Sequence, residues 1–229
     1  MIIIERGIHT VELYLQGVSY AAAQKIISDL YKKKMIYPKK KNVLTGNNTY
    51  VVQGLFPDGI IMHLEQRYAN PGGVRFIINP HTLVSGQYVP EALYCPEKES
   101  CVLSDTIQMI QHEFEEGDHQ VWKADWKKLT LSRVDLTWNL HLSDQMDLTE
   151  VIRLCKHGQR KKSAKVTHFQ DLNQEHHSFR MVRSDTTLTV YDKDFQIAQK
   201  KHKKNEDTQI LRVELALKSK AYRRALKMK

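Results

Sequence analysis

Hydrophobic and polar residues alternate along much of this chain, and the alternation predicts a series of β-strands. The alternating stretches cover residues 8–15, 49–56, 60–67, 74–79, 131–142, 177–183, 186–193 and 210–218. Apolar residues recur at helical spacing in residues 102–116 and after Ser19, which is a good helix N-cap. Two further helices are predicted after the capping box Asp147–Glu150 and after Ser219.

These elements together predict one α+β domain over residues 1–229, with a predominantly antiparallel sheet and flanking helices. The last predicted helix, AYRRALKMK, reaches the end of the chain without a stop signal. We therefore expect the chain to be truncated at its C-terminus.

The composition is that of a globular protein with a basic charge balance. Of the 229 residues 41% are hydrophobic, and 35 Lys and Arg against 26 Asp and Glu give a net charge of +9. Such a charge favours a polyanionic partner, although basic proteins without nucleic-acid partners are common. Three cysteines without a CxxC pair suit a reducing compartment, and no apolar run reaches membrane length. We expect a cytoplasmic protein that does not enter the membrane.

Three predicted strands in the second half of the chain carry reactive side chains on their polar faces. Asp135 lies in the first of these strands, Tyr191 and Lys193 in the second, and Arg212 and Glu214 in the third. If the strands are neighbours, the five side chains converge. Two carboxylates are suitable ligands for Mg²⁺ or Mn²⁺. A phenol with a pKa near ~10 needs a nearby cation before it can attack a phosphate. Basic groups offset the negative charge on that phosphate. The set therefore suits phosphodiester cleavage.

The same pattern has a second interpretation, which the residues alone leave open. Charged residues on one face of an antiparallel strand are also what a solvated sheet face carries, and a strand tyrosine often serves packing alone.

The order and spacing of these motifs resemble those of rolling-circle replication initiators, including the gene II protein of filamentous phages and Rep proteins of the staphylococcal plasmid type. The matching pieces are Arg133-Val-Asp135, Tyr191-Asp-Lys193 and Arg212-Val-Glu214, followed by the basic helix 219–229. The resemblance covers residues 131–229 and extends only loosely to residues 1–130.

The resemblance implies that Tyr191 is the nucleophile and leaves a 5′-phosphotyrosine link and a free 3′-OH. It also implies that Asp135 and Glu214 hold the divalent metal, while Lys193 and Arg212 contact the phosphate. The His-hydrophobic-His metal motif of many nicking enzymes is absent, and His63-Leu64-Glu65 is the nearest equivalent. His63 is thus a candidate third ligand, with an ordinary exposed strand as the alternative.

Basic clusters flank the proposed nucleophile in the sequence and are candidate contacts to the DNA backbone. The candidates are Arg160, Lys161, Lys162, Lys165, Lys200, Lys201, Arg223 and Arg224. Solvated loops and a surface helix are the alternative interpretation. The expected partner is single-stranded or hairpin origin DNA, and a host helicase is a further candidate partner.

The sequence thus predicts a metal-dependent, site-specific enzyme that nicks and joins single-stranded DNA and initiates rolling-circle replication. Two alternatives from other classes stay open. One is a non-catalytic DNA-binding replication regulator on the same fold, and the other is a metal nuclease that uses water as its nucleophile.

Overall fold

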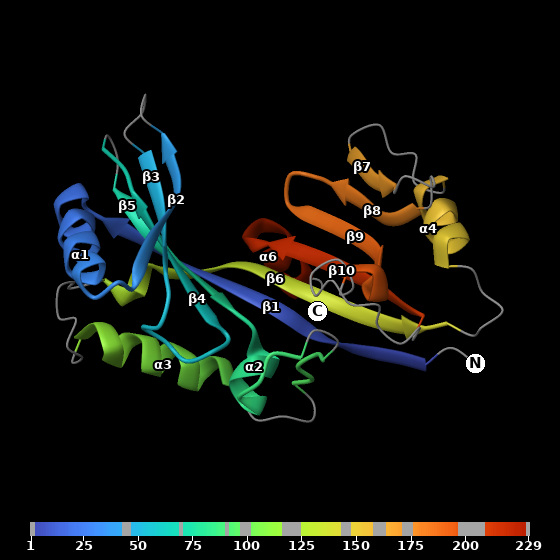
Figure 1. Cartoon of the computed structure of the whole chain (residues 1–229), viewed down its shortest axis with the longest axis horizontal. Coiled ribbons are helices and arrows are strands. Elements are labelled where there is room, and N and C mark those ends of the chain that lie inside the picture. Colours follow the sequence, from blue (N-terminus) through green and yellow to red (C-terminus); the bar gives the residue numbers. More distant parts are fainter. Residues whose placement is uncertain are drawn as a thin grey trace. The chain divides into compact units, whose positions relative to one another are not determined.

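A computed structural model of the chain has the α+β fold that the sequence predicts, with an antiparallel sheet and flanking helices (Figure 1). The structure describes residues 3–42, 47–68, 71–89, 92–96, 102–115, 125–142, 148–157, 164–170, 176–196 and 209–227. Within these residues ten strands are hydrogen-bonded in the order β2-β3-β4-β5-β1-β6-β10-β9-β8-β7. None of the helices in these ranges is long and apolar enough to cross a membrane.

The strands are β1 (Ile3–Val18), β2 (Ile36–Asn42), β3 (Asn47–Val52), β4 (Ile60–Gln66), β5 (Gly72–Ile78), β6 (Leu129–His141), β7 (Lys165–Gln170), β8 (His176–Val182), β9 (Thr186–Asp192) and β10 (Ile210–Lys218). The helices are α1 (Tyr20–Lys32), α2 (Pro80–Ser85), α3 (Val102–Glu115), α4 (Leu148–His157) and α6 (Ser219–Lys227), with a 3-10 turn at Trp126–Lys128. Residues 193–196 are also helical.

The fold divides into two compact units, each assembled from separate stretches of the chain. Unit 1 comprises Met1–His9, Val89–Cys95 and Arg133–Lys229, and unit 2 comprises Thr10–Tyr88 and Pro96–Ser132. Strands β1 and β6 each contribute residues to both units. A single catalytic domain over residues 1–229 stays a prediction.

Unit 2 has a sheet with one apolar face, which its helices cover. Met62, Leu64 and Phe76 on this face are fully buried. Helix α1 begins after Ser19, whose Oγ accepts a hydrogen bond from the Ala22 amide at 3.1 Å, as the sequence predicts. The ring of Phe114 on α3 lies 6.0 Å from that of Phe76, so α3 packs against the same apolar face.

Unit 1 has a second apolar core, on one face of strands β10, β9 and β8. Phe179, Val190 and Leu211 are buried there and pack against Ile152 of α4. Because side chains alternate along a strand, the residues between these apolar positions lie on the opposite face. The polar residues predicted to be catalytic lie on that opposite face.

Most predicted elements are present, and the differences occur where the local pattern is weak. Strand β10 has the predicted bounds, while β1 extends beyond residues 8–15 in both directions. Strands β2 and β7 and the short helix α2 were not predicted. Strand β2 is rich in lysine and β7 is largely polar, and both lack the apolar alternation that marks a half-buried strand. They are recognised as strands only by their pairing with β3 and β8.

Candidate active site

The register of unit 1 places three reactive strands side by side, in the order β6, β10, β9. Arg212 on β10 lies opposite Asn139 on β6 and opposite Tyr191 on β9. Glu214 lies two residues further along β10, on the same face. Directly opposite residues on one face of an antiparallel pair have adjacent side chains, so Tyr191, Arg212 and Glu214 form one group.

A chain of hydrogen bonds runs through this group. The Tyr191 hydroxyl donates to Glu214 Oε1 at 2.7 Å, and Arg212 Nε donates to Asn139 Oδ1 at 2.7 Å. Asn139 Nδ2 in turn donates to Glu5 Oε2 on β1 at 3.1 Å. Arg212 and Asn139 are both 0% exposed, so these bonds hold the guanidinium at a defined place beside the phenol.

The surroundings of Tyr191 keep its hydroxyl protonated. Burial is the main cause that raises the pKa of Tyr191 above its ordinary value, and the negative charge of Glu214 raises it further. The positive charge of Arg212 acts in the opposite direction and lowers it. A phenol in this state needs a proton acceptor before it can attack, and the Glu214 carboxylate is already in contact with its hydroxyl.

The centre of the polar face of these strands is largely buried, which is not the state of a solvated sheet face. Asp135 and Lys193 are each 3% exposed and Thr137 is 1% exposed. Burying charged groups is unfavourable unless they are paired, and such clusters are typical of functional sites. The alternative of a solvated face is therefore wrong.

A pocket of about 310 Å³ opens beside the tyrosine. Its lining residues are His177, Ser178, Thr189, Tyr191, Asp192, Phe195, Gln196 and Glu214. The His177 ring stacks on Phe195, with centroids 3.5 Å apart, and its Nδ1 lies 3.7 Å from Asp192 Oδ2. Sequence reasoning missed both rings, because no spacing motif links residue 177 to residue 195.

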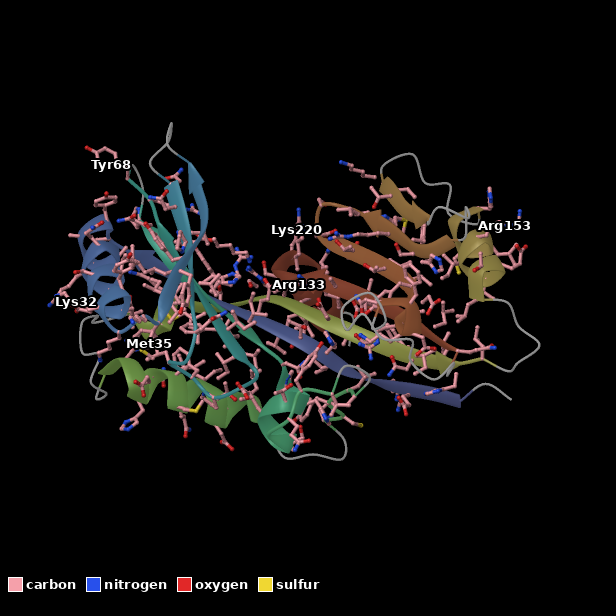
Figure 2. The ribbon with its side chains drawn as sticks, in the orientation of Figure 1. Lys32, Met35, Tyr68, Arg133, Arg153 and Lys220 are labelled. Atoms are coloured by element: carbon pink, nitrogen blue, oxygen red, sulfur yellow. The ribbon has the colours of Figure 1, made fainter. Side chains whose placement is uncertain are left out.

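Two other predicted residues of unit 1 have defined partners near this group. Arg133 donates from Nε and Nη2 to the two Asp135 oxygens, at 2.6 Å each (Arg133 is labelled in Figure 2). Lys193 Nζ donates to Gln196 Oε1 at 2.9 Å and lies 5.7 Å from the centre of the Tyr191 ring. Lys193 is thus near the nucleophile, whereas the Asp135 carboxylate is held by an arginine.

The donor set does not fit a divalent cation as the side chains stand. Asp135 and Glu214 are hard oxygen ligands, but Arg133 occupies both oxygens of the first, and the Tyr191 hydroxyl occupies one oxygen of the second. Within the described part of the chain, no three His, Cys, Asp or Glu side chains gather around one point.

His63, the predicted third ligand, belongs to unit 2 and has cationic neighbours. Its Nε2 lies 3.3 Å from Lys39 Nζ, and Arg75 is its partner across the β4–β5 pair. Burial, Lys39 and Arg75 lower the pKa of His63 to about 4. Two positive charges beside an imidazole repel a metal cation, so these surroundings oppose the predicted role of His63 as a ligand.

The predicted DNA contacts are only partly within the described residues. Arg160, Lys161, Lys162, Lys200 and Lys201 lie outside them. Lys165 is exposed on β7, and Arg223 is exposed on α6. The neighbouring Arg224 forms an ion pair with Asp185, which offsets its charge.

Comparison with known proteins places few constraints on this chain. No protein-family model matches it, and no curated protein matches its sequence. Among solved structures, it is similar to a rolling circle replication initiator protein from Geobacillus stearothermophilus, with a TM-score of 0.47 and 11% sequence identity. That match covers 99% of this chain and 78% of the other.

Proposed function

We propose that this protein cuts and rejoins a single DNA strand through a covalent link to Tyr191, and so initiates rolling-circle replication. The observation that carries the proposal is a buried tyrosine whose hydroxyl donates to Glu214 at 2.7 Å, beside a buried arginine and a pocket. A packing tyrosine does not need a buried arginine beside it and a half-buried carboxylate in contact with its hydroxyl. The motif order around Tyr191 supports the same chemistry.

In the proposed step, Tyr191 Oη forms a bond to phosphorus while the bond from phosphorus to the 3′-oxygen breaks. Glu214 accepts the phenolic proton and releases it to water, while the departing 3′-oxygen takes one proton from water, so protons and net charge balance and the carboxylate is regenerated. Arg212 stabilises the negative charge on the transferring phosphate, held in place by Asn139. The products are a 5′-phosphotyrosine and a free 3′-OH, which is able to prime synthesis or to reverse the reaction.

The cation and the partners stay predictions. A divalent cation would polarise the scissile phosphate, but the two carboxylates are engaged, so no step above depends on it. Single-stranded or hairpin origin DNA is the proposed substrate. A host helicase is a candidate partner that no contact in the described residues identifies.

Covalent trapping tests the proposal. The protein is incubated, with and without Mn²⁺, with end-labelled single-stranded DNA of randomised central sequence, so that no origin has to be assumed. The products are resolved on a denaturing gel. We expect a protein–DNA adduct that Tyr191→Phe abolishes and that the matched variant Tyr222→Phe, on α6, retains.

Other outcomes contradict the proposal in different ways. An adduct that persists in Tyr191→Phe removes the role of Tyr191. Binding without cleavage favours a non-catalytic regulator, whereas cleavage without an adduct favours a nuclease that uses water. Loss of the adduct with EDTA in the wild-type protein would establish the metal requirement.

A further inference from the structure

Unit 2 carries a concentrated positive charge that the proposed active site does not use. Six lysines lie at residues 32–34 and 39–41, and no acidic residue occurs between Asp29 and Asp58. Lys32 ends helix α1 and points away from the ribbon (Figure 2), and the second group of three lysines lies in strand β2. For a chain of net charge +9, this one segment contributes a large share of the attraction to polyanions.

The sheet of unit 2 presents a row of polar and aromatic side chains on the face opposite its apolar core. Direct pairing across the strands places Tyr37, His63, Arg75 and Tyr14 in this row, with the apolar Val51 between Tyr37 and His63. Tyr37 is 50% exposed, and its hydroxyl donates to the Lys34 carbonyl at 2.9 Å. The Arg75 guanidinium lies 5.9 Å from the centre of the Tyr14 ring, and its side chain is 40% exposed. The row is therefore accessible, and its ring at Tyr37 is held in place.

The electrostatics at the centre of the row favour an anion. Lys39 and Arg75 both lie beside His63, and the acidic neighbours of Arg75 are Glu12 at 3.4 Å and Glu65 at 3.5 Å. Burial is the largest cause that lowers the pKa of His63, the charges of Lys39 and Arg75 lower it further, and Glu65 raises it. At the imidazole the two positive charges thus outweigh the negative charge of Glu65.

We infer that this face of unit 2 binds single-stranded DNA, with a backbone phosphate at Lys39 and Arg75 and a base stacked on Tyr37. A positively charged surface with an accessible aromatic ring is the usual arrangement for binding single strands. The identity of the polymer as DNA rests on the proposed function. The binding itself goes beyond that function, because these residues lie in unit 2 and take no part in the Tyr191 chemistry.

Salt-dependent binding measures the phosphate contact. Fluorescence anisotropy with a labelled oligothymidine, in the Tyr191→Phe protein, gives the affinity as a function of salt concentration. Lys39→Gln should reduce the slope of log affinity against log salt by about 0.7, the value expected for one phosphate on a single strand. Lys25→Gln, an exposed lysine on α1, is the matched charge control and should leave the slope unchanged.

Stacking is measured by two variants at one position. Tyr37→Leu removes the ring and should weaken binding by roughly 5- to 150-fold, the range observed for loss of one base–aromatic stack. Tyr37→Phe keeps the ring and loses only the bond to the Lys34 carbonyl, so its affinity should stay within about threefold of the parent. Thermal melts of all variants establish that the fold is retained.

His63 serves as a probe of the bound phosphate. A negative charge beside the imidazole favours its protonated form, so NMR titration should show a pKa that rises from about 4 when oligothymidine is added. If Lys39→Gln and Tyr37→Leu bind as the parent does and the pKa of His63 does not move, the inference is wrong. The lysines then serve only to keep the exposed strand β2 from pairing with another chain.

Failure of this inference is distinguishable from failure of the proposed function. The adduct assay depends on Tyr191, whereas the binding assay is carried out in a protein that lacks its hydroxyl. An adduct with unchanged binding in the unit 2 variants overturns only the inference. Reduced binding in these variants without any adduct from wild-type protein overturns only the tyrosine chemistry.

Discussion

Replacing Tyr191 with phenylalanine removes the hydroxyl that contacts Glu214 and keeps the ring, so it isolates the electrostatics of the candidate site. At pH 7 the wild-type protein has a hydrogen bond to a charged acceptor that the variant lacks. Such a bond contributes about 2 kcal/mol, so we expect the free energy of unfolding of Tyr191→Phe to be lower by that amount.

This difference should shrink at high pH, and the direction follows from the raised pKa of Tyr191 in the folded protein. Above pH ~10 the unfolded chain loses the phenolic proton while the folded chain retains it. The stability from Tyr191 is therefore fully present below pH ~10 and is lost above it, by about 1.4 kcal/mol per pH unit. At pH 11 the wild-type advantage should have fallen to about a third of its value at pH 7.

Urea denaturation at several pH values between 7 and 11, followed by tryptophan fluorescence, measures this difference. Titration of lysines affects both proteins equally and cancels when they are compared. Tyr222→Phe, on α6 of the same unit, is the control for removing a tyrosine hydroxyl elsewhere in that unit. A Tyr191→Phe difference that stays constant, or that grows with pH, would refute the reasoning. Growth would mean that Arg212 outweighs burial and Glu214, and that the site lowers the pKa of its tyrosine.

Two further predictions concern the neighbours of Tyr191. Glu214→Gln retains a hydrogen-bond acceptor for the phenol but removes the base. The rate of adduct formation should therefore fall by roughly 10²- to 10⁴-fold, while the affinity for single-stranded DNA stays unchanged. A near-normal rate would exclude Glu214 as the base. Asn139→Ala removes the acceptor of a buried guanidinium N–H, so the free energy of unfolding measured in urea should fall by about 3 kcal/mol. A loss below about 1 kcal/mol would show that Asn139 does not hold Arg212 in place.

Part of the candidate site could be predicted from the sequence because strand alternation is a local property. Residues two apart on a strand share a face whatever the strand pairs with, so Arg212 and Glu214 had to lie together. The identity of the proposed proton acceptor was not predictable. The contact of Glu214 with the Tyr191 hydroxyl depends on the register between β9 and β10. Backbone hydrogen bonds form in the same way for many different sequences, so they do not by themselves select this register.

The assignment of His63 shows the limit of a motif taken without its surroundings. His63 and Glu65 do share a face of a strand, as their spacing predicts. The chain folds so that Lys39, from another strand, lies against the imidazole, and a cation there makes a metal ligand unfavourable. Strand pairing brings charged side chains from other parts of the chain next to His63. These charges, and not the neighbours of His63 in the sequence, determine whether it can bind a metal.

The sequence by itself determined the α+β class, most of the strands, the cap of α1 and the separation of polar from apolar faces. Each follows from interactions among residues close together in the chain. Only the tertiary structure decided that the polar face with Asp135 is buried, that Tyr191 donates to Glu214, and that the His177 ring stacks on Phe195 beside the pocket. These features depend on contacts between distant segments, and burial is a property of everything that packs around a side chain.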